Sequence, residues 1–313
     1  MAGAPRHARP RQNRILPETK RPRNSVRPAS SRFTVTYTGT DSAGVENYTF
    51  TASNNGPGMQ QLRVVRPMSP RPRLGHNFLY ALPVQAGLQD DYGDGLRELA
   101  SLDVHNQYNV TIVSPTFSHD PWYADNPKNP ELSDETFMTR SLVPWVRRHL
   151  SDGSAEQNWL IGFSKSGVGA QTLLLRNPDL FAVAASWDFP ANMSSYRQYK
   201  GNTRTCYGTN ASFKAHYELT DGFISTRRTP FMAQNRIWIG GYEAFGQDVF
   251  DYSERLASVG IKHTSDMREF TTHRWDSGWV PAALAAMCEA SRELQVPAVP
   301  AASSHRWLAQ DSA

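Results

Sequence analysis

The stretch Asn158–Ala170, NWLIGFSKSGVGA, decides the fold of this chain. An apolar run ends at Gly162, and Ser164 then stands among small residues before a pattern typical of a helix. A strand that turns sharply into a helix needs small neighbours, because larger side chains would collide with both elements. The stretch therefore indicates either a tight turn without function or a serine held as a nucleophile at the carboxyl end of a strand.

Short apolar runs alternate with helical patterns on both sides of this stretch. The runs cover residues 78–83, 110–113, 159–161, 182–186 and 237–239, and the helical patterns cover 92–102, 136–150, 166–175, 250–259 and 280–293. Buried strands that alternate with amphipathic helices predict an α/β fold with a mostly parallel sheet covered on both faces. Strand patterns at 33–38, 47–52 and 61–65 predict a short β extension at the N-terminal side of a domain that spans 33–295.

The two ends of the chain have a different composition. Residues 1–32 carry nine Lys and Arg side chains and a single acid, Glu18, whereas the rest of the chain has a slight acidic excess. This Pro- and Arg-rich tail lacks large apolar residues and is predicted to be disordered, and residues 296–313 are expected to be loose. The tail is either solubilising or an arm that binds nucleic acid or anionic surfaces by charge, and we expect nucleic acid to be at most a nonspecific partner.

Targeting signals are not visible in the sequence. No apolar run approaches the roughly 18 residues of a membrane helix, so no membrane partner is expected. The basic tail has no apolar core of a secretory signal. These features favour a cytoplasmic location, with secretion open if the true start of the chain differs.

Motifs for metals and cofactors are also missing. The sequence has no HExxH, GxxxxGK[ST] or GxGxxG pattern, so neither a metal nor a cofactor is expected. Cys206 and Cys288 form no CxxC pair and indicate neither a disulfide framework nor a zinc site, although one bridge between them stays open.

A nucleophilic serine needs a base, and His273 in FTTHRWDSGW is the candidate. It follows a strand-like stretch at 268–272 and precedes the last helical pattern. In proteins with a serine at such a strand-to-helix turn, the histidine comes last in chain order. His263 lies before that stretch, at the wrong end of it.

Several stretches from about Phe78 to Trp279 resemble the putative-esterase group of α/β-hydrolases. The matching pieces are FLYALPVQAG, SPTFSHDPWYAD, DETFMTRSLVPWV, LIGFSKSGVGAQTLLLRNPDLF, IWIGGYEAFGQDVFDYSERLASVGI and HRWDSGW. The group includes S-formylglutathione hydrolases, feruloyl and enterochelin esterases and mycolyltransferases. The resemblance implies an α/β-hydrolase fold, Ser164 as nucleophile and His273 as base. One departure is Ser166, which stands where the G-x-S-x-G pattern has glycine.

The acid that completes a triad has three candidates. By the family pattern an acid follows the strand that ends near Gly240, and Glu243 has the commonest offset from it. Asp188 follows the preceding strand, and Asp248 stands at the start of the next helical pattern. We rank Glu243 first, Asp188 second and Asp248 third. The choice between them depends on which carboxylate reaches His273, and only the geometry of the folded chain decides that.

Backbone N–H groups are expected to hold the oxyanion. Lys165 follows the serine at the start of a helix and is the first candidate donor. The second is expected in the loop after the first parallel strand, where Pro83 has no N–H, so Gln85 is the candidate, with Val84 as the alternative. Trp122 and Tyr123 are expected on the loop after the next strand and are candidates for substrate binding, with plain packing as the alternative.

These observations predict a serine esterase that acts on a small-molecule or saccharide ester through an acyl-enzyme on Ser164. One alternative is an acyltransferase on the same residues, which differs in the acceptor that the pocket admits. Another is a binding module without catalysis on the hydrolase scaffold, since fold alone does not establish activity. Substrate identity and oligomeric state stay open.

Overall fold

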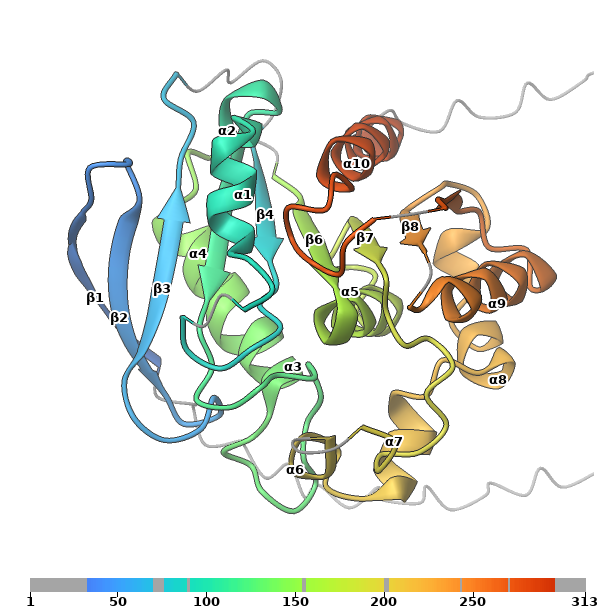
Figure 1. Ribbon diagram of the computed structural model, residues 1–313. Coiled ribbons are helices and arrows are strands. Elements are labelled where there is room, and N and C mark those ends of the chain that lie inside the picture. The colour runs from blue at the N-terminus through green and yellow to red at the C-terminus, as the bar shows by residue number, and fades with distance from the viewer. Residues whose placement is uncertain are drawn as a thin grey trace, which may run out of the picture. The chain divides into compact units, whose positions relative to one another are not determined.

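A mixed sheet organises the chain in the computed structural model, which describes residues 33–69, 76–88, 91–153, 156–199, 203–242, 244–269 and 271–295. In these residues the sheet has nine strands in the order β1-β2-β3-β5-β4-β6-β7-β8-β9 (Figure 1). The strands are β1 (Phe33–Thr40), β2 (Glu46–Ala52), β3 (Gln60–Val65), β4 (Asn77–Ala81), β5 (Val110–Pro115), β6 (Asn158–Phe163), β7 (Val183–Trp187), β8 (Ile237–Gly241) and β9 (Thr264–Met267).

The parallel part of the sheet is its buried centre. β1, β2, β3 and β5 pair antiparallel in succession, and the pairs from β5 across to β9 are parallel. Every residue of β4, β5, β6, β7 and β8 is buried. Strands buried on both faces read as continuous apolar runs, which is why the sequence identifies them. The predicted α/β fold with a mostly parallel sheet and an N-terminal β extension is confirmed.

Helices supply the two outer layers. Their bounds are α1 (Gly95–Ser101), α2 (Val104–Gln107), α3 (Asp134–Thr136), the π-helical turn η2 (Phe137–Leu142), α4 (Val143–His149), α5 (Ser164–Arg176), α6 (Thr203–Tyr207), α7 (Asn210–His216), α8 (Asp221–Ser225), the 3₁₀ turn η3 (Thr229–Phe231), α9 (Gly246–Ser258) and α10 (Val280–Gln295). Two apolar cores separate along β4, where Leu79 joins the cluster of α1, α2 and α10. Its neighbours Phe78 and Tyr80 join the cluster of α4, α5 and α9. Successive side chains of a strand point to opposite faces, so the two cores cover the two faces of the sheet.

Two local predictions are wrong, and a third predicted element, a helix, is present with a change of winding. The strand before His273 is Thr264–Met267 and not 268–272, because it is an exposed edge strand without the apolar pattern used to find strands. The first helix begins at Gly95, since the Asp94 side chain accepts hydrogen bonds from the Leu96 and Arg97 N–H groups and caps it there. The helix predicted at 136–150 is interrupted by the π-helical turn.

The described residues all belong to one compact unit. The domain bounds 33–295 stay a prediction. Residues 1–32 and 296–313, for which disorder and looseness were predicted, lie outside the described residues. Within the described part of the chain, no helix combines the length and the apolar character that crossing a membrane requires.

Candidate active site

Ser164 sits at the turn from β6 into α5. The strand ends at Phe163, the helix begins at Ser164, and Ser164 has a φ of 51°. A left-handed backbone is uncommon for a residue with a side chain and costs on the order of 1–3 kcal/mol, so it persists only where the surroundings enforce it. The turn therefore holds the serine in a strained position at the carboxyl end of a central strand.

Small neighbours make this turn possible. A Cβ on Gly162 would lie 2.6 Å from the backbone oxygen of Ser166, and a Cβ on Gly167 would lie 2.8 Å from Phe189 Cβ. The Ser166 hydroxyl donates to the Phe163 carbonyl at 2.9 Å and accepts from the Phe163 N–H at 3.1 Å. The serine that replaces glycine in the pattern thus closes the turn by hydrogen bonds to the last residue of the strand.

Asp188 occupies the matching position on the neighbouring strand. Phe163 pairs with Trp187 in the parallel ladder between β6 and β7, so Ser164 and Asp188 follow paired residues. Asp188 also has a left-handed backbone, with a φ of 49°, and its side chain is fully buried. Its N–H donates to the Gly240 carbonyl at 2.8 Å, which fixes the turn against β8.

His273 contacts this buried carboxylate. Its Nδ1 is hydrogen bonded to Asp188 Oδ2, and the Phe245 N–H donates to Asp188 Oδ1 at 3.3 Å. The rings of Phe163, Phe245 and Tyr92 surround the imidazole, with centroids 5.1, 5.6 and 5.7 Å from its own. The histidine is oriented by one hydrogen bond and by rings on several sides, while a quarter of its side chain stays exposed.

Ser164 and His273 open into the same cleft of about 310 Å³. Its lining residues come from segments far apart in the chain: Tyr92, Asp120, Trp122, Ser164, Lys165, Pro190, Tyr199, Phe245 and His273. The cleft lies beyond the carboxyl ends of the parallel strands, where open α/β sheets bind ligands. A hydroxyl, an oriented imidazole and a buried carboxylate at such a place are the groups that acyl transfer by a serine nucleophile requires.

The three acid candidates have different surroundings. Asp188 is hydrogen bonded to His273, although the sequence ranking placed it second. Asp248 instead accepts a hydrogen bond from the Asn192 N–H at 2.9 Å, and burial raises the pKa of this carboxyl group. Glu243, the first choice from sequence, lies outside the described residues.

Trp122 and Tyr123 have different positions. Trp122 lines the cleft and stacks on Tyr199, with ring centroids 5.9 Å apart and an interplanar angle of 30°. Tyr123 is fully buried, and its hydroxyl donates to the Pro83 carbonyl at 2.7 Å. Tyr123 is not among the residues that line the cleft, so its expected substrate contact is corrected: it supports the loop that contains Pro83.

The loop 82–88 after β4 approaches the serine turn. Its ends are fixed, since the Leu82 N–H donates to the Ile161 carbonyl at 3.0 Å and the Gly87 N–H donates to the Phe117 carbonyl at 2.9 Å. The Gln85 side-chain amide donates to Asp91 at 2.7 Å. The assignment of the Gln85 and Lys165 N–H groups to an oxyanion stays a prediction.

Several residues that line the cleft carry no signal in the sequence. Tyr92, Tyr199 and Phe245 come from segments without a chemical motif, and only the folded chain brings them together. Asp120 had a visible signal, because it precedes Trp122 in the loop after β5. Its carboxylate accepts a hydrogen bond from Lys165 Nζ at 2.9 Å, immediately beside the serine.

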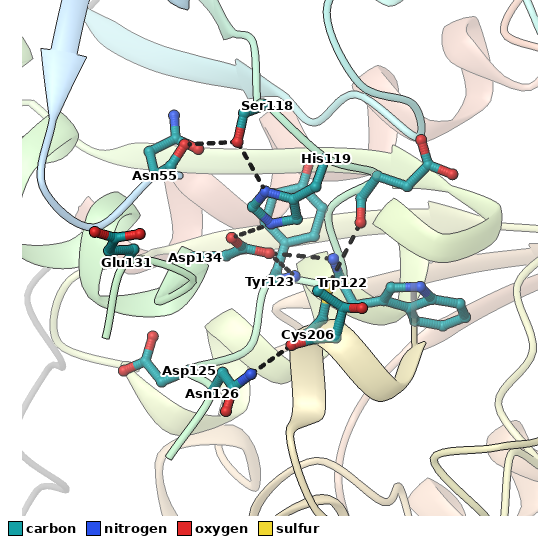
Figure 2. A network of polar contacts seen from close by, with 12 residues as sticks. Asn55, Ser118, His119, Trp122, Tyr123, Asp125, Asn126, Glu131, Asp134 and Cys206 are labelled. Carbon is teal, nitrogen blue, oxygen red and sulfur yellow. Dashed lines mark hydrogen bonds and ion pairs between the residues drawn. The ribbon is translucent and has the colours of Figure 1, made fainter. Parts of the chain in front are cut away.

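A buried polar network supports this loop (Figure 2). Atoms of His119, Asp134 and Cys206 that could bind a metal lie within 4.8 Å of one another, a grouping that no motif in the sequence predicts. They are hydrogen bonded inside the protein: His119 Nε2 to Asp134 at 2.9 Å, and Cys206 Sγ to the Asp120 carbonyl at 3.4 Å. Burial raises the pKa of the Cys206 thiol well above its usual value, which keeps it protonated. These hydrogen bonds indicate that the cluster holds the loop after β5 in place.

The network has one further consequence for charge. Burial by itself would lower the pKa of His119, but its hydrogen bond with Asp134 and the charges of Asp134 and Asp120 raise it above the usual value. Asp134 is itself fully buried and also accepts hydrogen bonds from the N–H groups of Trp122 and Tyr123, each at 3.2 Å.

Both described cysteines, Cys206 and Cys288, are free, so the bridge that the sequence left open does not form.

Comparison with solved structures gives the same fold. An S-formylglutathione hydrolase from Agrobacterium tumefaciens is 15% identical with a TM-score of 0.56, over 82% of this chain and 98% of that chain. FphF, a fluorophosphonate-binding serine hydrolase of Staphylococcus aureus, is 14% identical with a TM-score of 0.57, over 83% and 99%. MPT51 (FbpC1) of Mycobacterium tuberculosis is 16% identical with a TM-score of 0.56, over 83% and 98%.

Comparison of sequences gives a match over part of the chain. No curated protein sequence matches the chain. Residues 89–240 match the family model described as Putative esterase, and this range contains Ser164 and Asp188. The chain thus has the fold of these hydrolases, and its residues 89–240 match the putative esterase group.

Proposed function

We propose that the protein hydrolyses carboxylic esters through an acyl-enzyme on Ser164, with His273 as general base and acid and Asp188 as the acid of the triad. The observation that carries this proposal is the hydrogen bond between His273 Nδ1 and the buried Asp188, with His273 and Ser164 in one cleft. The family match supports ester hydrolysis as the general reaction.

Asp188 would set the tautomer of the imidazole. Because the carboxylate accepts from Nδ1–H, Nε2 keeps its lone pair for the proton of Ser164. The serine oxygen then bonds to the ester carbonyl carbon, and His273 gives the proton to the leaving alcohol. Asp188 stabilises the imidazolium that forms in between.

The tetrahedral intermediate carries a negative oxygen that needs hydrogen-bond donors. The Lys165 N–H belongs to the first turn of α5, where unpaired N–H groups and the helix dipole favour an anion. Gln85 in the loop 82–88 would be the second donor. Water then attacks the acyl-enzyme with His273 as base, and the acid is released with Ser164 restored.

The walls of the cleft suggest the kind of ester. Trp122 and Tyr199 form a stacked pair on one part of the cleft, and Tyr92 and Phe245 flank His273. A cleft of about 310 Å³ suits a small molecule, and aromatic walls favour an acyl chain or a ring on it. We therefore propose a small-molecule ester whose apolar part packs against Trp122 and Tyr199.

The test is hydrolysis of short-chain p-nitrophenyl esters by the wild type, Ser164→Ala and His273→Ala. The serine variant is expected to lose on the order of 10⁴–10⁶-fold in kcat. His263→Ala is the matched control, because His263 is hydrogen bonded to Ser253 and is not among the lining residues of the cleft. Mass spectrometry of the quenched reaction should find the acyl group on the peptide that contains Ser164.

Two outcomes would change this proposal. A folded Ser164→Ala protein that keeps most of the activity would contradict it. Acyl transfer to an added alcohol in preference to water would make the protein an acyltransferase on the same residues.

A further inference from the structure

The Asp120 carboxylate contacts both the loop 82–88 and the residue that follows Ser164. Its Oδ1 accepts a hydrogen bond from the Ala86 N–H at 3.0 Å, and its Oδ2 accepts from Lys165 Nζ at 2.9 Å. Ala86 belongs to the loop 82–88, and Lys165 is the residue after the serine. One carboxylate thus connects the loop that would supply an oxyanion donor with the turn that holds the nucleophile.

The hydrogen bond from Ala86 completes a frame around the middle of the loop. Tyr123 holds the Pro83 carbonyl on one side, and Phe117 and Asp120 hold the Gly87 and Ala86 N–H groups on the other. The residues between these contacts are Val84 and Gln85, the two candidates for the second oxyanion donor. An oxyanion donor works only when it is held in place before the reaction, because it then costs no reorganisation.

Asp120 is itself held by the buried network of Figure 2. Asp134 fixes the loop on both sides of Asp120, through His119 before it and the N–H groups of Trp122 and Tyr123 after it. The Asp120 carbonyl accepts from the Cys206 thiol. Asp120 is therefore a rigid element from which the loop 82–88 can be positioned.

The negative charge of Asp120 is balanced by the Lys165 ammonium. Asp120 lines the cleft, so its negative charge lies near the place where an oxyanion would form. A carboxylate without a counter-ion would oppose that second negative charge. The Lys165 ammonium balances it, and both side chains of the pair are partly exposed, at 23% for Lys165 and 33% for Asp120.

We infer that Asp120 is a positioning residue that shapes the loop 82–88 for the oxyanion, and that Lys165 is the counter-ion that makes this carboxylate tolerable in the cleft. The inference rests on the proposed ester hydrolysis by Ser164. It assigns to the Lys165 side chain a role separate from that of its backbone N–H.

The two halves of the inference predict different mutant behaviour. Asp120→Ala removes the Ala86 contact and should lower kcat about 10- to 100-fold with little change in KM. Asp120→Asn keeps an oxygen for the Ala86 N–H and should keep most of the activity. Lys165→Met leaves the carboxylate without its counter-ion and should lower kcat about 10-fold or more.

The decisive variant combines Lys165→Met with Asp120→Asn. Once the carboxylate is neutral, the loss of the ammonium matters less, so the double variant should be more active than Lys165→Met alone. A purely structural role of the pair predicts the opposite order, because the double variant loses both partners. Lys214→Met is the matched control, since Lys214 forms an exposed pair with Glu218 at 3.3 Å and should change nothing.

All variants are assayed for kcat and KM on a short-chain ester and for thermal unfolding. Asp120→Ala or Lys165→Met within twofold of an active wild type would overturn the inference alone. The absence of rescue in the double variant would also overturn it. A folded wild type without esterase activity would overturn the proposed function and this inference with it.

Discussion

Replacing Asp188 with asparagine tests the triad at the contact that defines it. The carboxylate accepts two hydrogen bonds, from His273 Nδ1 and from the Phe245 N–H. The amide oxygen of asparagine can keep the bond from Phe245, but its NH₂ group then faces Nδ1 and forces that nitrogen to accept. The proton moves to Nε2, which can no longer take the proton of Ser164. The expected loss in kcat/KM is about 10³–10⁴-fold, or roughly 4–5.5 kcal/mol.

The assay compares Asp188→Asn with Asp248→Asn and Glu243→Gln on the same ester. Unfolding in urea is measured alongside, because the altered hydrogen bond of a buried group costs about 1–3 kcal/mol of stability on its own. Asp248 contacts the Asn192 N–H, so its variant should keep activity within a fewfold of wild type. A folded Asp188→Asn protein with more than a tenth of the wild-type kcat/KM would refute the reasoning, as would a large loss in Glu243→Gln instead.

Two further predictions concern the serine turn and the loop beside it. Gly162→Ala would place a Cβ 2.6 Å from the Ser166 backbone oxygen. This clash should lower the free energy of unfolding in urea by about 1–3 kcal/mol and reduce esterase activity. Gly222→Ala is the control and should be close to neutral, because the nearest atom to its Cβ would be 3.9 Å away. Equal effects of the two variants would contradict the account of the turn. The raised pKa of His119 means that the folded state binds its proton more tightly than the unfolded state. Its stabilising contribution should be complete below the usual histidine pKa of about 6.5 and be lost as the pH rises through the raised value. Thermal unfolding across this range should show that loss in the wild type and not in His119→Asn, and parallel curves would contradict it.

The central strands and the serine turn could be predicted from the sequence because each depends on a local pattern of residues. The central strands are buried on both faces and read as apolar runs, and the serine turn needs Gly162 and Gly167 for steric reasons that the sequence displays directly. His273 follows from chain order. The edge strand Thr264–Met267 has no such rule, because its exposed residues carry no apolar pattern.

The choice among the three candidate acids could not be made from the sequence. Three carboxylates follow or approach strand ends, and an offset rule favours Glu243 among them. The ladder between β6 and β7 instead sets Asp188 beside Ser164, because Trp187 pairs with Phe163. Strand register is a property of the folded sheet, so the contact of Asp188 with His273 is visible only there.

Asp120 illustrates the same limit for the rest of the cleft. Its contacts with Ala86 and Lys165 join segments that are 34 and 45 residues away in the chain. Tyr199 and Phe245 reach the cleft from segments after β7 and β8, without any motif. Such groupings depend on how loops pack after the sheet has formed.

Labelling with a fluorophosphonate probe tests the central claim most directly, since the probe reacts only with an activated serine. The wild type and Ser164→Ala are compared after both are shown to fold. The account predicts one label on the wild type, found on the peptide that contains Ser164, and none on Ser164→Ala. A folded wild type that takes no label, or a Ser164→Ala protein that is labelled as well as wild type, would contradict it.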